Sequence, residues 1–148
     1  MNKLELKIPP PIIFTLTVFL IYFSPKSEPT ELRTYAALFF LSLGIFLLLI
    51  AVIQFFVNRT TVDPRDPSKS TTLVTNGIYR FTRNPIYLGF LILLISLSFY
   101  CAHWLSVIYC ACFYFYITEL QIKPEERFLT EKFGEDYRNF LKNVRRWI

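Results

Sequence analysis

Residues 35–57 read YAALFFLSLGIFLLLIAVIQFFV, a stretch without one charged side chain. A helix needs about 20 apolar residues to cross the hydrocarbon core of a bilayer. Only Ser42, Gly44 and Gln54 interrupt the apolar character of this stretch. It therefore predicts a transmembrane helix, and it predicts that the chain is an integral membrane protein.

A second apolar stretch, residues 86–118, contains no Lys, Arg, Asp or Glu. It is too long for one span, and a break near residues 101–103 divides it into two helices of about 15 residues, below the usual spanning length of about 17–25. We therefore predict a tight hairpin within the membrane. His103 at its tip is predicted to be a surface or hydrogen-bonded residue.

Three cysteines, Cys101, Cys110 and Cys112, fall in this hairpin. Together with one nearby histidine they lack the paired spacing of a zinc site, so no metal site is expected. Free cysteines of this kind pack as small hydrophobic side chains. We predict that all three are buried apolar residues.

A shorter apolar segment, residues 12–23, follows Lys3 and Lys7. A basic region followed by an apolar run is also the pattern of a secretory signal peptide. The next residues, 24–26, read SPK and lack the small-residue cleavage pattern, so a retained signal anchor is favoured. The chain then has four membrane helices, and both termini lie on one side.

The distribution of basic residues predicts the orientation, because Lys and Arg favour the cytoplasmic side of short loops. The N-terminus has two, the loop 58–85 has five and the tail from residue 119 has seven, against two in the loop 24–34. Both termini and the loop 58–85 are therefore predicted to face the cytosol. Nucleic-acid binding is not expected, since the net charge of +5 is spread around membrane spans.

These observations predict an all-α fold in a single domain over residues 1–148. At 148 residues, 53% of them hydrophobic, the chain has the size and composition of one membrane domain. The expected architecture is a polytopic membrane helix bundle of about four transmembrane helices, with a short hairpin and a cytosolic C-terminal amphipathic helix. The sequence leaves the oligomeric state open.

Polar side chains are costly inside lipid, so chemistry is expected where loops meet helix ends. In the segment 63–89, Asn84 suits a helix N-cap and Pro85 suits the first helical position. The free amides of that turn attract anions, and the Arg83 guanidinium can bind a carboxylate through two hydrogen bonds. Alternatively, Arg80 and Arg83 are interfacial anchors that contact lipid head groups.

The segment 123–147 contains a second set of charges. Pro124, Glu125 and Glu126 read as a helix start with acids in its first turn. Gly134 is predicted to interrupt the helix. Apolar residues recur downstream at helical spacing, and an amphipathic helix lying on the membrane surface is one interpretation of them. They are Leu129, Phe133, Tyr137, Phe140, Leu141 and Val144.

Arg83 and Glu125, brought to one face of the bundle, would offer a cation and an anion at the membrane boundary. A zwitterionic ligand matches such a site. S-adenosylmethionine has an amino acid moiety that can use both charges, and Tyr79 and Tyr87 can contact its adenine or its sulfonium. A phospholipid head group or a nucleotide remains an alternative on charge alone.

Four short motifs in this order resemble the isoprenylcysteine carboxyl methyltransferase and phospholipid methyltransferase superfamily of integral membrane enzymes. The region that contains them runs from about residue 63 to 147. A membrane hairpin separates the second motif from the third. The motifs are TLVTNGIY at 72–79, RNPIYLG at 83–89, EERFL at 125–129 and FGEDY at 133–137.

The resemblance implies that one pocket binds S-adenosylmethionine and that the chain is a methyltransferase. The implied cofactor-binding residues are Leu73, Val74, Tyr79, Arg83, Asn84, Pro85, Ile86, Tyr87 and Glu125. Some members have histidine where this chain has Asn84, and the prenylcysteine enzymes have a substrate-associated arginine where it has Gln121. These differences put an imidazole role and a prenylcysteine substrate in doubt.

The predicted function is methyl transfer from S-adenosylmethionine, which enters from the cytosol, to a lipophilic or small-molecule acceptor that enters through the membrane lipid. Arg83 and Glu126 are the predicted catalytic residues, with Glu126 a base if the acceptor is an amine. One alternative is an NADPH-dependent membrane sterol-type reductase. The other is a non-enzymatic membrane protein in which Arg83 and Glu125 only pair or anchor helices.

Overall fold

The computed structural model describes residues 5–28, 30–57 and 73–148, and every regular element within these ranges is helical, which confirms the all-α class. The loop 58–72, with the first residue of the first motif, lies outside the described residues. The α-helices are α1 (Pro10–Tyr22), α2 (Glu31–Val57), α3 (Pro85–Cys101), α4 (Leu105–Ile117), α5 (Lys123–Phe133) and α6 (Glu135–Asn143).

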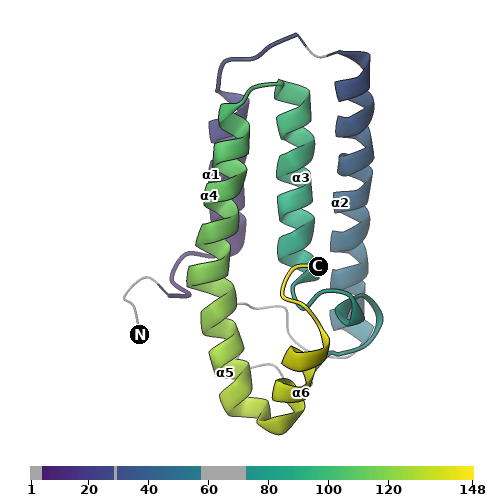
Figure 1. Cartoon of the computed structure of the whole chain (residues 1–148), viewed down its shortest axis with the longest axis vertical. Coiled ribbons are helices and arrows are strands. Elements are labelled where there is room, and N and C mark those ends of the chain that lie inside the picture. Colours follow the sequence, from purple (N-terminus) through teal and green to yellow (C-terminus); the bar gives the residue numbers. More distant parts are fainter. Residues whose placement is uncertain (1–4, 29, 58–72) are drawn as a thin grey trace.

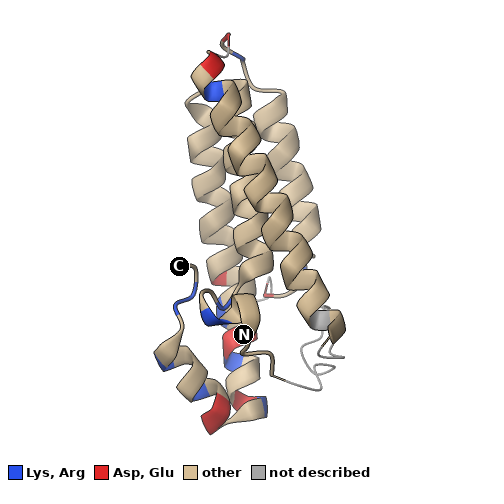
Figure 2. Ribbon diagram, turned by 90° about the vertical axis from the view of Figure 1, so that its right-hand side faces the viewer, with Lys and Arg blue, Asp and Glu red and all other residues tan. Residues whose placement is uncertain are grey.

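The helices α1 to α4 lie side by side along the long axis, and α5 and α6 extend beyond one end (Figure 1). The helix α3 contacts α1, α2 and α4, and its contact with α2 is the most extensive in the bundle. The Lys, Arg, Asp and Glu residues lie at the two ends, and the middle of the bundle shows none of them (Figure 2). The bundle thus has an apolar band between two polar ends.

Two helices, Glu31–Gln54 and Leu105–Phe133, are long and apolar enough to cross a membrane. The helices α1 and α3 are apolar but shorter. On the outer face of α2, large side chains such as Phe39 and Phe46 are 61% and 57% exposed. Contiguous exposed apolar surface of this extent is typical of lipid contact.

The helices α2 and α3 approach most closely at a pair of glycines. A β-carbon at Gly89 would lie 2.8 Å from Cγ of Leu48 and 3.3 Å from the carbonyl oxygen of Gly44. Small residues at such crossings let two membrane helices pack at short range. The buried Ser96 hydroxyl adds a hydrogen bond of 2.7 Å to the Ala37 carbonyl of α2. Gly89 therefore serves helix packing.

We expect Gly89→Leu to destabilise the bundle, because the new side chain must displace Leu48 or push α2 away. Overpacking of this kind typically costs about 1–3 kcal/mol. Thermal unfolding of the purified protein in detergent should show a lower midpoint than the wild type. Ala111→Leu is the matched control, since Ala111 is exposed on α4. Equal midpoints for the two variants would contradict this account of the crossing.

The predicted hairpin is confirmed, with its turn at Ala102. This residue has a left-handed backbone with φ of +54°, and it ends α3. The Leu105 N–H donates to Nδ1 of His103 at 3.2 Å, so His103 has a hydrogen-bonding role in the turn. Cys101 and Cys110 are buried as predicted, but the prediction is wrong for Cys112, which is exposed on the outer face of α4.

The second arm of the hairpin continues far beyond the predicted end. The helix α5 has Pro124 and both glutamates in its first turn as predicted, but a π-helical turn, Thr118–Ile122, joins it to α4 without a break. Proline cannot donate to the carbonyl four residues earlier, which here is that of Leu120. That carbonyl instead accepts the N–H of Leu6 at 3.1 Å. The N-terminal segment thus satisfies the group that Pro124 leaves unpaired.

Candidate active site

The loop before α3 is anchored to the end of α2. Gly77 has φ of +57°, a left-handed conformation that glycine adopts without a steric penalty. The Gln54 side chain of α2 accepts a hydrogen bond of 3.2 Å from the Ile78 N–H. A β-carbon at Gly77 would collide with this amide. The contact positions the short 3-10 turn Gly77–Arg80, which contains Tyr79.

The first turn of α3 is tied to the C-terminal segment. Asn84 occupies the N-cap position and Pro85 starts the helix, as predicted, but the Asn84 side chain makes no capping hydrogen bond. The Asn84 Nδ2 donates to the Arg146 carbonyl at 2.9 Å. The Arg83 N–H donates to the Arg145 carbonyl at 3.1 Å. The side-chain amide of Asn84 therefore joins the start of α3 to a residue 62 positions later in the sequence.

Glu126 of α5 binds two arginines. Arg146 donates to both of its oxygens, through Nε to Oε1 at 3.0 Å and through Nη2 to Oε2 at 2.7 Å. Arg83 reaches Oε1 with Nη2 at 2.9 Å. The side chains of Arg83, Glu126 and Arg146 are 10%, 13% and 32% exposed. Two guanidinium groups thus meet one carboxylate, which leaves a positive charge in excess.

The Arg83 guanidinium is only partly used by these contacts. Its Nη1 makes a long hydrogen bond of 3.4 Å to the Leu141 carbonyl, and its Nε is buried with no partner among the described residues. A buried donor without a partner costs about 1–3 kcal/mol. Arg83 therefore has hydrogen-bonding capacity left for an anion.

Glu125 faces Tyr87 and not an arginine. The Tyr87 hydroxyl of α3 donates to Oε1 of Glu125 at 2.6 Å. Among the residues that the structure describes, Glu125 has no ion-pair partner, and the carboxylate that Arg83 contacts is that of Glu126. Burial, followed by the charge of Glu125, raises the pKa of the Tyr79 hydroxyl. Glu125 thus accepts a hydrogen bond from Tyr87 and has no cation beside it among the described residues.

Tyr137 of α6 is buried within the electrostatic reach of both sets of charged groups. Burial raises the pKa of its hydroxyl most, Glu126 and Glu125 raise it further, and Arg83 and Arg146 oppose the shift. All four charges are therefore close enough to act on one hydroxyl, although Arg83 and Glu125 do not touch. Because its pKa is raised, Tyr137 stays a neutral hydrogen-bond donor.

An apolar cluster covers this side of the charged groups. Tyr137 and Phe140 are buried against Val74 and Tyr79 of the loop. The apolar stripe of the C-terminal helices therefore packs on protein, so its interpretation as a membrane-surface helix is wrong. Gly134, with φ of +57°, separates α5 from α6 as predicted and reverses the chain. The other members of the cluster are Leu73, Ile78, Leu129, Phe133, Leu141 and Val144.

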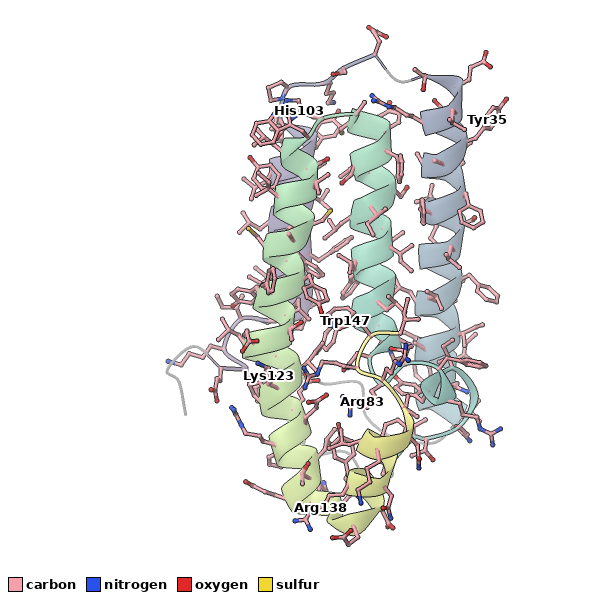
Figure 3. All side chains as sticks on the ribbon, viewed as in Figure 1. Tyr35, Arg83, His103, Lys123, Arg138 and Trp147 are labelled. Atoms are coloured by element: carbon pink, nitrogen blue, oxygen red, sulfur yellow. The ribbon has the colours of Figure 1, made fainter. Side chains whose placement is uncertain are left out.

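Trp147 and Arg83 both lie near the end of the bundle from which α5 extends (Figure 3). The indole N–H of Trp147 donates to the Thr118 hydroxyl at 3.2 Å, and its ring lies 4.9 Å from that of Tyr114. Trp147 also packs against two of the buried hydrophobic clusters, both of which include residues of α3. Hydrogen bonds therefore hold the residues on both sides of Arg146: the Arg145 carbonyl before it and the Trp147 indole after it.

The structure brings together most of the residues that the sequence singled out. Arg83 meets Glu126, Tyr87 meets Glu125, and Leu73, Val74 and Tyr79 share the covering cluster. Pro85 is buried and Ile86 half-buried in the first turn of α3. Sequence reasoning missed Arg146 and Trp147, and it gave Tyr137 no site role. These three residues lie far along the chain from Arg83, so no local sequence pattern indicates that they share its site.

The comparisons with known proteins decide the family. The phospholipid methyltransferase family matches residues 32–136, which is most of the chain. This chain belongs to the phospholipid methyltransferase family. The match starts in α2, upstream of the region 63–147 that contains the sequence motifs, and it includes Arg83, Glu125 and Glu126.

Two curated relatives are enzymes named protein-S-isoprenylcysteine O-methyltransferase. The one from Schizosaccharomyces pombe is 29% identical over 109 residues, 74% of this chain and 46% of the relative. The one from Dictyostelium discoideum is 29% identical over 87 residues, 59% and 37% of the two chains. This phospholipid methyltransferase family member thus spans less than half the length of both enzymes.

A third relative is an uncharacterized protein of Haemophilus influenzae, 36% identical over 66 residues, which are 43% of this chain and 100% of the relative. No solved structure matches the chain. The family match and the relatives' names confirm the resemblance to membrane methyltransferases. Together with the two long apolar helices, they make the chain a membrane protein of a methyltransferase family.

Proposed function

We propose that this chain transfers a methyl group from S-adenosylmethionine to a lipophilic acceptor, and that the donor binds between Arg83 and Glu125. The observation that supports the site most is the pair of opposite charges left without full compensation. Arg83 shares one carboxylate oxygen with Arg146, and within the described part of the chain Glu125 accepts the Tyr87 hydroxyl but has no ion-pair partner. Buried charges of this kind are costly unless a ligand pairs with them.

The residues present fit the amino acid moiety of S-adenosylmethionine. The unpartnered Nε of Arg83 offers a donor for the carboxylate, and Glu125 offers an acceptor for the ammonium. The hydroxyl of Tyr87 contacts Glu125, the charge of Glu125 also acts on the Tyr79 hydroxyl, and both rings suit an adenine or a sulfonium. In this proposal Leu73, Val74, Asn84, Pro85 and Ile86 form the remaining wall of the pocket.

The bound donor supplies a methyl group on a sulfonium that is already a good leaving group. The protein's own task is to align the acceptor with that methyl carbon and to exclude water, which can contribute about 7–11 kcal/mol when the geometry is ideal. Glu126 is bound by guanidinium groups at both oxygens. Any role as a base for an amine therefore requires Arg146 to release one of them.

The acceptor is proposed to reach the site from the bilayer. The charged groups lie at the end of the apolar band, where α5 leaves the bundle (Figures 1 and 2). Two relatives carry names that specify an isoprenylated cysteine, and the family name specifies phospholipids. Both are lipophilic acceptors. We propose a multi-pass topology with the site and both termini on the cytosolic side, where the donor is dissolved.

The test is transfer of a labelled methyl group from S-adenosylmethionine to organic-extractable lipid. Membranes that contain the wild-type protein should label extractable material well above membranes that contain the Arg83→Gln variant at equal protein level. Mass spectrometry of the labelled product identifies the acceptor and the methylated atom. Equal labelling by both membranes would contradict the proposal, and NADPH consumption in place of labelling would favour the reductase.

A further inference from the structure

The C-terminal Arg146 pairs with Glu126 in a way that determines what Arg83 can bind. Arg146 occupies both carboxylate oxygens at 3.0 and 2.7 Å, in the fork geometry that guanidinium and carboxylate prefer. Arg83 shares only Oε1 at 2.9 Å. Without Arg146, the same carboxylate would be available to Arg83 through both oxygens.

The position of Arg146 is built into the fold. Its carbonyl accepts the Asn84 side chain at 2.9 Å and the Thr82 hydroxyl at 3.4 Å. The next residue, Trp147, is fixed by its hydrogen bond to Thr118. These contacts come from α3's entry turn and from the π-helical turn, and they place the Arg146 guanidinium beside Glu126. Hydrogen bonding to Glu126 also raises the pKa of Arg146, which therefore stays charged.

We infer that Arg146 is a positioning residue that occupies Glu126 and so keeps the Arg83 guanidinium available for the carboxylate of the donor. This inference rests on the proposed donor site. In this arrangement Glu126 orients Arg83 through one oxygen and does not neutralise it fully. Two arginines share one carboxylate, so one positive charge is not neutralised by it. Arg83, whose Nε is buried without a partner among the described residues, is the arginine that can offer this charge to a ligand.

The inference makes an unusual prediction for a pair of substitutions. In Arg146→Gln, Glu126 is free to bind Arg83 through both oxygens, and we expect the affinity for S-adenosylmethionine to fall at least about tenfold. In the double variant Arg146→Gln/Glu126→Gln, no carboxylate competes for Arg83. We expect its affinity to return to within about twofold of that of Glu126→Gln alone.

The measurement is calorimetric titration of S-adenosylmethionine into the purified full chain in detergent, for each variant that shows a single thermal unfolding transition. Arg138→Gln is the matched control, because Arg138 forms an exposed pair with Glu135 on α6 at 2.6 Å. If Arg146→Gln does not fold, Arg146→Lys replaces it. Lysine keeps the charge but lacks the fork, so a smaller loss that Glu126→Gln again restores is expected.

Two results would overturn the inference while the proposed function stands. One is unchanged affinity in Arg146→Gln alongside loss in Arg83→Gln. The other is a double variant that binds far more weakly than Glu126→Gln alone, which would mean that Arg146 supports the fold or contacts the donor itself. If the wild-type protein does not bind S-adenosylmethionine, the proposed function fails, and this inference fails with it.

Discussion

Arg83→Gln is expected to weaken binding of S-adenosylmethionine by about a hundredfold or more, the equivalent of the charge-assisted hydrogen bonds that one guanidinium gives to a carboxylate. The variant should still fold, because Glu126 keeps both hydrogen bonds to Arg146 and therefore does not become an unpaired charge. Calorimetric titration in detergent measures the affinity, and thermal unfolding verifies the fold.

Arg80→Gln is the control for this effect. Arg80 lies three residues earlier in the same loop, but it is exposed and lines a surface pocket with Asp136 and Asn139, away from Glu126. Its substitution removes the same charge and should leave the affinity close to that of the wild type. Equal losses in the two variants would mean that Arg83 acts only through the net charge of the surface, as the head-group anchor alternative requires.

Glu125→Gln is expected to lose donor binding without losing stability. The amide keeps an oxygen that accepts the Tyr87 hydroxyl, but it offers no charge to the ammonium group of the donor. We expect an affinity loss of about tenfold to a hundredfold, typical of one charge-assisted hydrogen bond. A buried carboxylate without a cation is costly in the unliganded protein, so the midpoint of thermal unfolding should stay equal or rise.

The matched control is Glu131→Gln, because Glu131 lies on the same helix and is exposed. It should change neither affinity nor unfolding. A fall of both affinity and stability in Glu125→Gln would show that Glu125 is a structural residue. That result would favour the non-enzymatic alternative, in which Arg83 and Glu125 serve only the packing of helices.

The helices and turns were predictable because their signals are local. The uncharged run at 35–57 became most of α2, and the pair Asn84 and Pro85 marked the start of α3. Gly77 and Gly134 both adopt the left-handed backbone that their turn roles require. The continuation of the hairpin through Pro124 was not predictable. It depends on the distant Leu6 N–H, which pairs the carbonyl that proline leaves open.

The sequence predicted which residues belong to the site, but it did not predict which of them contact one another. Arg83, Glu125 and Glu126 were identified from charges beside helix ends, and the structure places them together. The sequence could not indicate which acid Arg83 meets, because that choice depends on Arg146. Arg146 returns to the site only after the chain reverses at Gly134, and its carbonyl bonds Asn84 across the fold. Contacts of such long sequence separation have no local pattern.

Binding of S-adenosylmethionine by the wild-type protein tests the central claim most directly. Calorimetric titration into the purified full chain, in detergent and again in lipid nanodiscs, should show saturable binding that NADPH at the same concentrations does not reproduce. That result would establish the donor between Arg83 and Glu125 once both variants lose it. A folded protein that binds no S-adenosylmethionine in either environment would contradict the account.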